Sequence, residues 1–309
     1  MIGIVGAAIF SASETGRLAY SLFEPYQYQF VWFDRSGKPL GTVGDPGVFY
    51  SFDLSEDGKR LIVARAKNNT VNLWLLDLER GPLSQVTFGD AIEFDPRWGP
   101  GDRIAWDSTK DGVRQLMQGG LDGQKPIARK EHGFLDDWSA DGRFLLYRAD
   151  SGPDALFAVP LFGESSPIPL AAAGDEASFS KDGRLVACYS GESGRGEVYV
   201  QGFPPTSPKQ QVSANGGVQP VWGRDGELYY LGLDGMLYAV TVVVDGARVK
   251  LGQPRVLFKT PIDTVRPDVE QYATTDGHRF LFLTPVARQQ RSIDVILNWP
   301  AAIKLQTRP

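Results

Sequence analysis

Short apolar runs bounded by polar turn residues recur along the whole chain of 309 residues. The runs at residues 144–147 and 228–231 are typical, because apolar side chains occupy successive positions there. Successive apolar positions are expected in strands that are packed on both faces. No stretch keeps the 3.6-residue period of an amphipathic helix. The pattern therefore predicts many short, buried strands and no helical domain.

One turn motif accompanies these strands. It consists of a bulky apolar residue, a small or polar residue, a variable residue, Asp-Gly, a basic or polar residue and then an apolar strand. The clearest copies lie at residues 54–59, 138–143, 179–184 and 222–227, and weaker copies lie at residues 13–17, 98–103 and 274–278. Neighbouring copies begin about 40 to 44 residues apart, except for one interval of about 51 that contains an insertion in residues 241–254. Seven copies at this spacing indicate one structural unit repeated along the chain.

Each part of the motif has an expected structural role. Asp-Gly tolerates positive φ, which a tight hairpin turn requires. The bulky residue four positions before the glycine is expected to pack between neighbouring sheets. A second strand follows the turn, then an often aromatic third strand such as residues 71–76, and a short fourth strand such as residues 84–87. Four antiparallel strands about every 42 residues predict the blade of a β-propeller.

We therefore predict an all-β chain with a single propeller domain over residues 1–309, built from seven blades of four antiparallel strands, with six blades as the alternative. The expected repeats are residues 10–49, 50–91, 92–133, 134–174, 175–216, 217–267 and 268–300, the last completed by residues 1–9. The last repeat offers three strands, at residues 269–273, 279–283 and 293–299. Residues 2–10 are expected to supply its fourth strand, so that the N-terminal strand joins the last blade. Such closure would leave no blade with an open edge.

Composition and charge argue against several functions. The net charge is −5, and no run of Lys or Arg exceeds two residues, which speaks against nucleic-acid binding. The single cysteine, Cys188, excludes an internal disulfide and a multi-cysteine metal site. The two histidines, His132 and His278, fall in different repeats, and no Gly-x-Ser-x-Gly elbow occurs. Residues 1–10 are apolar but too few to span a membrane. We expect a monomer with no catalytic residue, no dedicated metal site and no membrane span.

Acidic and amide residues recur just before or within the expected first strand of several repeats. They are Glu93, Asp95, Asp136, Asp137, Asp175, Glu176, Gln219, Asp268 and Glu270. If each repeat is one blade, these residues gather at one mouth of the central channel. Oxygen ligands there could bind calcium, or the negative charge could attract a basic peptide or an amine. The alternative is that they are ordinary turn residues between consecutive blades.

The repeat resembles the TolB-type, WD-repeat-like propeller repeat of bacteria over essentially the whole chain. Residues 31–41 and 293–299 are similar to segments of the propellers attached to bacterial membrane-anchored serine/threonine kinases. The resemblance implies an extracytoplasmic sensing or protein-interaction module without fixed catalytic residues. It leaves open whether the chain is a free-standing relative or part of a kinase, because the sequence contains neither a kinase domain nor a membrane helix.

The expected function is non-catalytic binding of a protein or peptide partner, as a sensor or scaffold in kinase-like signalling. The alternative is a metal-dependent propeller enzyme of the lactonase or lyase type that uses the acidic channel mouth. Calcium is the candidate cofactor of the acidic residues, and no other cofactor is expected.

Overall fold

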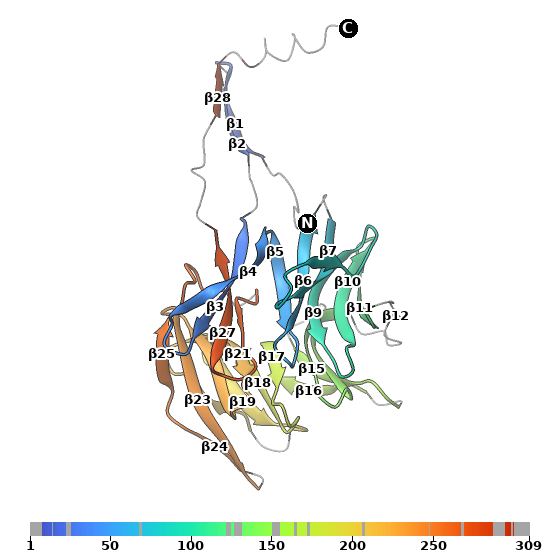
Figure 1. Cartoon of the computed structure of the whole chain (residues 1–309), viewed down its shortest axis with the longest axis vertical. Coiled ribbons are helices and arrows are strands. Elements are labelled where there is room, and N and C mark those ends of the chain that lie inside the picture. The colour runs from blue at the N-terminus through green and yellow to red at the C-terminus, as the bar shows by residue number, and fades with distance from the viewer. Residues whose placement is uncertain are drawn as a thin grey trace.

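The computed structural model describes residues 8–13, 15–22, 26–67, 70–121, 125–126, 132–149, 155–163, 166–171, 174–205, 208–246, 248–266, 269–286, 294–297 and 299. All elements of this part of the chain are strands, β1 to β28, and they form seven antiparallel sheets (Figure 1). The all-β prediction is confirmed. Within the same residues there is no helix with the length and apolar character needed to cross a membrane.

Four sheets each contain four strands that follow one another along the chain. The first holds β5 (Phe49–Leu54), β6 (Arg60–Lys67), β7 (Thr70–Asp77) and β8 (Leu83–Gln85). The second holds β9 (Ile92–Trp98), β10 (Ile104–Lys110), β11 (Val113–Gly119) and β12 (Lys125–Pro126). The third holds β13 (Gly133–Trp138), β14 (Phe144–Ala149), β15 (Leu156–Pro160) and β16 (Ile168–Ala171). The fourth holds β17 (Asp175–Phe179), β18 (Leu185–Ser190), β19 (Glu197–Gly202) and β20 (Gln210–Gln211).

The next sheet has one additional strand. It holds β21 (Gly217–Trp222), β22 (Glu227–Gly232), β23 (Met236–Asp245), β24 (Arg248–Leu251) and β25 (Arg255–Lys259). The far half of β23 pairs with β24 from Val242↔Leu251 to Asp245↔Arg248, while its near half pairs with β25. The inserted hairpin explains the longer interval between turn motifs and confirms the insertion in residues 241–254.

The composite sheet joins strands from distant parts of the chain. It holds β26 (Tyr272–Ala273), β27 (Arg279–Pro285), β3 (Tyr28–Asp34) and β4 (Pro39–Gly47). We expected residues 2–10 to complete the last blade, and this prediction is wrong, because β27 pairs along its length with β3. The physical reason is hydrophobic burial, because the pairing buries Phe30 of β3 together with Leu281 and Leu283 of β27.

The outer sheet lies apart from the other six sheets (Figure 1). It holds β1 (Ala8–Ala12), β2 (Arg17–Leu22) and β28 (Asp294–Leu297). Residues 8–10 of the expected closing segment are in β1, and residues 2–7 lie outside the described residues. The strands of the expected first repeat are thus divided between the outer sheet and the composite sheet. A count of seven blades is not confirmed, since the described strands give six sheets of four or five strands.

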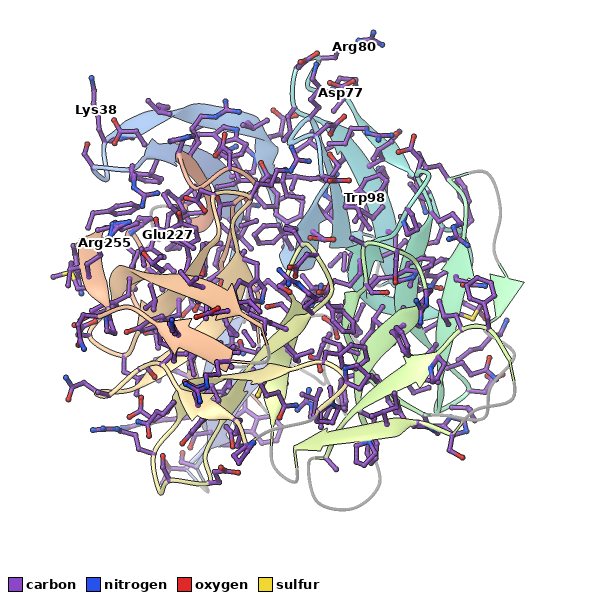
Figure 2. The ribbon with its side chains drawn as sticks, turned by 90° about the horizontal axis from the view of Figure 1, so that it is seen from below. Lys38, Asp77, Arg80, Trp98, Glu227 and Arg255 are labelled. Carbon is purple, nitrogen blue, oxygen red and sulfur yellow. The ribbon has the colours of Figure 1, made fainter. Side chains whose placement is uncertain are left out.

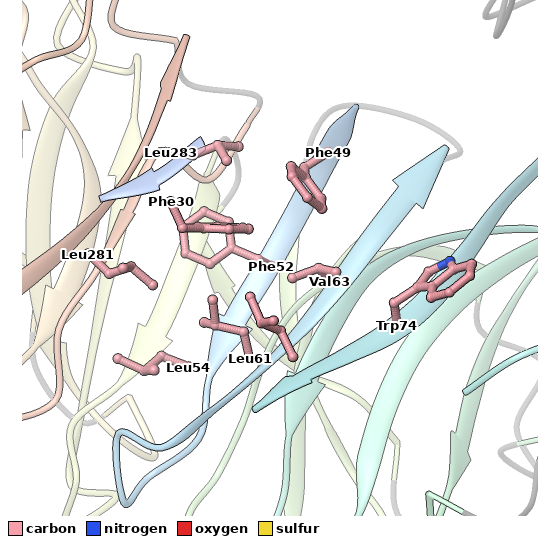
Figure 3. Packing of buried hydrophobic residues seen from close by; sticks show 10 residues of the cluster. Phe30, Phe49, Phe52, Leu54, Leu61, Val63, Trp74, Leu281 and Leu283 are labelled. Atoms are coloured by element: carbon pink, nitrogen blue, oxygen red, sulfur yellow. The ribbon is translucent and has the colours of Figure 1, made fainter. Parts of the chain in front are cut away.

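Six apolar clusters form the core, and each lies between two neighbouring sheets. The cluster in Figure 3 combines Phe30 of the composite sheet with Phe52 and Leu61 of the β5–β8 sheet. Four more clusters join consecutive sheets from β5–β8 to β21–β25. The sixth packs Tyr229 of the β21–β25 sheet against Phe280 of the composite sheet. Each of the six sheets therefore packs against two others, and Figure 2 shows them arranged around a common centre.

The repeated turns have the expected geometry. Gly58 and Gly142 adopt φ values of 70° and 75°, and Asp102, which stands in place of the glycine in one copy, adopts 59°. The Asp57 carboxylate accepts hydrogen bonds from the Lys59 backbone N–H at 3.0 Å and from the Ser55 hydroxyl at 2.6 Å. Trp138, four residues before its turn glycine, is buried between two sheets. These aspartates are turn formers, as the spacing indicated.

Candidate functional site

A cavity of about 160 Å³ lies at the centre of the molecule, where the first strands of the six sheets meet. Its charged lining consists of Asp53, Asp95, Arg97, Asp136, Asp137, Arg148, Asp175, Glu176, Lys181 and Glu270. Seven carboxyl groups thus face three basic groups. The centre of the molecule is strongly acidic.

Backbone bulges direct part of this lining inward. The first and second strands pair with an irregularity in five of the six sheets. At three of these sites the backbone turns left-handed, with φ of 46° at Asp95, 49° at Glu176 and 54° at Gln219. A β-bulge redirects a side chain and leaves one residue without its backbone pairing to the neighbouring strand. Asp95, Glu176, Gln219 and Glu270 all stand seven residues before the turn glycine or its Asp102 equivalent.

The structure brings together most of the residues that the sequence singled out. Those that line the cavity are Asp95, Asp136, Asp137, Asp175, Glu176, Gln219 and Glu270. Glu93 does not line it; this side chain is buried near Ser108, whose hydroxyl lies 3.2 Å from a Glu93 oxygen. Asp268 lies outside the described residues. Asp53, Arg148 and Lys181 also line the cavity and were not predicted. Asp53 stands five residues before its turn glycine, as Asp137 does, so alignment of these two repeats could have revealed it.

Several of the acidic side chains hold neighbouring sheets together. The Asp53 carboxylate accepts a hydrogen bond from the Trp98 backbone N–H of the next sheet at 2.8 Å. The Asp137 carboxylate accepts one from the Phe179 N–H at 2.7 Å in the same way. The Glu176 carboxylate accepts the Gln219 backbone N–H at 2.7 Å. These three carboxylates therefore have a structural role, although they lie within strands rather than in the turns between blades that the alternative interpretation named.

Arg97 is the main buried base of the site. Its guanidinium forms an ion pair with Glu270 and donates a hydrogen bond to the Asp136 carbonyl oxygen. Burial and the nearby Asp107 together raise the pKa of Asp95 to about 7, although Arg97 opposes the shift. Asp107 in turn forms an ion pair with Arg114. The carboxyl groups that line the cavity therefore outnumber the basic groups that could neutralise them.

Asp136 has an unused oxygen. The residue is only 8% exposed, and within the described part of the chain its Oδ2 has no hydrogen-bond partner. Burial raises the pKa of Asp136 well above its usual value, and the charge of Asp175 raises it further. The Arg148 guanidinium lies 3.0 Å from a carboxylate oxygen of Asp175 and forms an ion pair with it. A buried acceptor without a donor marks the point of this cavity at which a ligand would gain most.

A second cavity, of about 560 Å³, lies beside the first and shares Asp53, Asp137 and Lys181 with it. Turn residues of five sheets line it, at positions 55–57, 99–102, 140, 180 and 224. The acidic centre therefore borders a larger hollow on the side of the Asp-Gly turns. Among the residues that the structure describes, no three His, Cys, Asp or Glu side chains are grouped so as to hold a metal ion.

We expect the free energy of unfolding to fall as the pH rises from about 4 to about 7. Burial raises the pKa of Asp95 and of Glu93 to about 7, and that of Asp137 to about 6. These carboxyls bind protons more tightly in the folded protein than in the unfolded chain, so the stabilisation present at low pH is lost as the pH passes through the folded values. Each pKa unit of difference corresponds to about 1.4 kcal/mol.

Urea unfolding near pH 5 and near pH 7.5 measures this slope, with m-values compared to verify two-state behaviour. Asp95→Asn should flatten the slope. Asp141→Asn, in an exposed turn where hydrogen bonds lower the carboxyl pKa, should not flatten it. A stability that rises over this range in the unmodified protein would contradict the prediction.

Comparison with known proteins rests on structure alone, because neither a protein-family profile nor a curated protein matches the sequence. A putative TolB from Agrobacterium tumefaciens superposes with a TM-score of 0.62, covering 86% of this chain and 100% of that chain at 17% identity. TolB from Acinetobacter baumannii gives a TM-score of 0.53, with 94% and 81% covered at 14% identity. This chain has a TolB-like β-propeller fold.

The same propeller fold is shared by proteins of other kinds. Virginiamycin B lyase from Staphylococcus aureus gives a TM-score of 0.51, covering 93% of this chain and 97% of that chain at 10% identity. At such identities the likeness shows the fold alone. The predicted TolB-like propeller is confirmed, whereas the resemblance to kinase-attached propellers stays a prediction.

Proposed function

We propose that this propeller is a non-catalytic binding protein whose central cavity receives a basic side chain of a protein or peptide partner. The supporting observation is the unpaired, buried Oδ2 of Asp136 in a cavity where carboxyls outnumber bases. A cation that donates hydrogen bonds to such an oxygen compensates for its lost hydration. Binding would also favour the ionised form of Asp136 and release a proton, so affinity should increase as the pH rises.

The size of the cavities agrees with this proposal. Pockets for whole drug-sized ligands hold roughly 300–1,000 Å³, whereas the inner cavity holds about 160 Å³. That volume accommodates the end of one lysine or arginine side chain. The adjoining cavity of about 560 Å³ has room for the residues next to it.

We also propose that the six larger sheets are six blades of one ring, as in the alternative blade count. The six core clusters support this, because the last of them joins the β21–β25 sheet to the composite sheet. In this arrangement the composite sheet is the blade in which distant parts of the chain meet. The repeat limits that follow are one blade per sheet, with residues 28–47 and 272–285 sharing a blade.

The binding proposal is tested with a capped tripeptide, Ala-Lys-Ala, and its norleucine analogue, which keeps the aliphatic chain and lacks the ammonium group. We expect saturable binding of the lysine peptide by calorimetry or by NMR shifts, and none of the analogue. Asp136→Asn should weaken binding by about ten- to a hundredfold, as expected for a hydrogen bond between charged groups. The control Asp141→Asn removes the same charge from an exposed turn and should bind normally.

Equal binding of the two peptides would contradict the proposal, and so would equal affinities of the two variants.

The enzyme alternative is favoured by one observation, the carboxyl of Asp95 with a pKa near neutrality, which suits proton transfer. Stoichiometric calcium or zinc retained after dialysis would support its metal-dependent form.

A further inference from the structure

Two sheets break the pairing rule that the others follow, and they break it reciprocally. In the five sheets from β5 to β25, the second and third strands are consecutive and form a hairpin. In the composite sheet β27 pairs with β3 instead of with β28. In the outer sheet β2 pairs with β28 instead of with β3. If β3 paired with β2 and β28 paired with β27, consecutive strands would form hairpins in both sheets.

The first turn of the outer sheet contains the same backbone hydrogen bond as the first turn of the β5–β8 sheet. This turn, between β1 and β2, has the Gly16 N–H donating to the Ser13 carbonyl at 3.1 Å, as Gly58 donates to Ser55 at 2.8 Å in the β5–β8 sheet. Yet the described side chains of the outer sheet are poorly covered, with Val295 58% and Leu297 71% exposed. A small antiparallel sheet without a packed face is only marginally stable in water. Its apolar residues would gain by burial elsewhere.

We propose that the chain has a second arrangement in which β3 returns to β2 and β28 takes the place of β3 on β27. The composite sheet then divides between β27 and β3. One part, β26, β27 and β28, stays packed on the β21–β25 sheet; the other, β1 to β4, stays packed on the β5–β8 sheet. The ring changes from six sheets to seven, which is the number of turn motifs in the sequence.

The lengths and apolar patterns of the strands permit the exchange. The four residues of β28 pair with β2 in the outer sheet, and the seven residues of β3 pair with β27 in the composite sheet. After the exchange the six residues of β2 face β3, and β28 faces β27. The number of paired residues is nearly conserved. Phe280 keeps its contact with Tyr229, and Phe30 keeps its contact with Phe52, because each stays with its own half.

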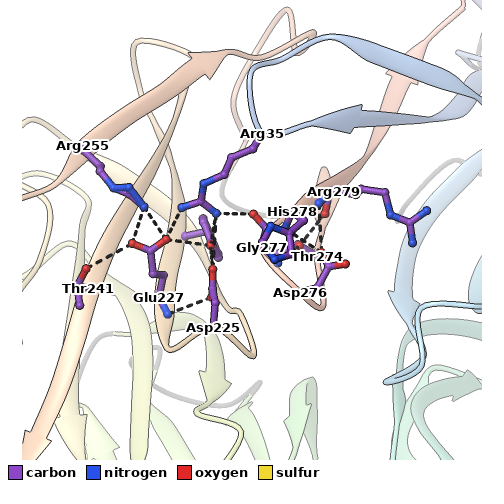
Figure 4. A network of polar contacts seen from close by, with 11 residues as sticks. Arg35, Asp225, Glu227, Thr241, Arg255, Thr274, Asp276, Gly277, His278 and Arg279 are labelled. Atoms are coloured by element: carbon purple, nitrogen blue, oxygen red, sulfur yellow. Dashed lines mark hydrogen bonds and ion pairs between the residues drawn. The ribbon is translucent and has the colours of Figure 1, made fainter.

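A polar latch holds the observed arrangement in place (Figure 4). Arg35, in the turn between β3 and β4, donates a hydrogen bond to the Tyr229 hydroxyl at 2.8 Å and another to the Gly277 carbonyl. Its guanidinium also forms ion pairs with Glu227 and Asp225, the latter at 3.6 Å. These contacts tie β3 and β4 to the β21–β25 sheet and, through Gly277, to the turn between β26 and β27. They would be lost if the composite sheet divided.

Paired cysteines distinguish the arrangements. Gln29→Cys with Thr284→Cys places two thiols opposite each other on β3 and β27, so it should form a disulfide in the observed arrangement. In the four sheets from β5 to β20 the residue two positions after the turn glycine, or after Asp102 in its place, faces the last residue of the third strand, as Arg60 faces Asp77. Applied to Gly16 and β3, that register places Leu18 opposite Asp34 and Ser21 opposite Val31. The thiols of Ser21→Cys and Val31→Cys should therefore form a disulfide only after the exchange. The native Cys188 is buried, and burial raises its pKa to about 12, so it should not react.

We expect both pairs to oxidise within one chain under mild conditions, as read by mass spectrometry of non-reduced peptides. The offset pair Tyr20→Cys with Val31→Cys places the thiols on opposite faces and should oxidise much more slowly. Arg35→Gln should accelerate closure of the Ser21–Val31 pair about tenfold, because it removes charged hydrogen bonds of the latch. Arg255→Gln removes another guanidinium from Glu227 within the β21–β25 sheet alone and should leave the rate unchanged.

Three results would overturn the exchange. The Ser21–Val31 pair could oxidise no faster than the offset pair, its disulfide could form only between chains, or the Arg35 and Arg255 variants could behave alike. None of these results bears on peptide binding at Asp136, so the two proposals fail or succeed separately.

Discussion

Phe280→Ala is expected to lower the free energy of unfolding by about 3–5 kcal/mol. Phe280 is fully buried between the β21–β25 sheet and the composite sheet. Its ring meets Tyr229 edge to face at 5.1 Å between centroids and Phe258 at 5.8 Å. Truncation removes the buried area and leaves a cavity that two twisted sheets fill only in part. The position joins distant parts of the chain, so the loss weakens the packing of the β21–β25 sheet against the composite sheet.

Equilibrium unfolding in urea, followed by tryptophan fluorescence, measures this effect. Phe162→Ala is the matched control, because the same side chain is 66% exposed there, and its effect should stay within about 0.5 kcal/mol. Similar effects of the two substitutions would show that the composite sheet does not pack against the β21–β25 sheet as described.

Arg97→Met is expected to cost about 3–5 kcal/mol near neutral pH, since it leaves buried carboxylates without their base. Arg97 forms the ion pair with Glu270 at the cavity wall, and its charge also acts on Asp53 and Asp95. Methionine keeps much of the volume and removes the charge, so the loss is electrostatic rather than steric. The same change makes the cavity more acidic.

The cost should depend on pH. Burial already raises the pKa values of Glu270 and Asp95, and without Arg97 both should rise further. Protonation then neutralises the carboxyls, so the variant should recover much of its stability as the pH falls toward about 5. The control Arg80→Met removes a guanidinium that is 84% exposed and should have little effect at any pH. A cost for Arg97→Met that is independent of pH would contradict the electrostatic explanation.

The binding proposal and the fold are connected through these buried acids. The Asp53, Asp137 and Glu176 carboxylates accept backbone N–H groups of neighbouring sheets, so they position the sheets around the centre. Asp136 makes no such contact through Oδ2. In the proposed function, these structural carboxylates create the negative field, and the unpaired Asp136 oxygen is the atom to which the basic group binds.

Much of the architecture follows from local sequence signals. Turn geometry is a local property, because Gly58 and its equivalents need positive φ and the preceding aspartates bond to the turn itself. Strand hairpins from β5 to β25 and the inserted hairpin at β24 follow from the spacing of those turns. The seven-residue offset between an inward-facing polar residue and the turn glycine is equally local. It explains why Asp95, Glu176, Gln219 and Glu270 reach one cavity.

Partner choice between distant strands was decided only by the tertiary structure. The sequence alone determined that seven turn motifs and all-β hairpins exist, but not that β27 pairs with β3, because that pairing depends on burying Phe30 beside Leu281 across almost the whole chain. The role of each acid was also undetermined, since Asp136 and Asp137 are adjacent in one strand and yet differ in their contacts. Asp137 receives the Phe179 N–H, whereas Asp136 keeps a free oxygen. Local conformation is encoded by neighbouring residues, while long-range pairing and the supply of hydrogen-bond donors depend on which surfaces the folded chain brings together.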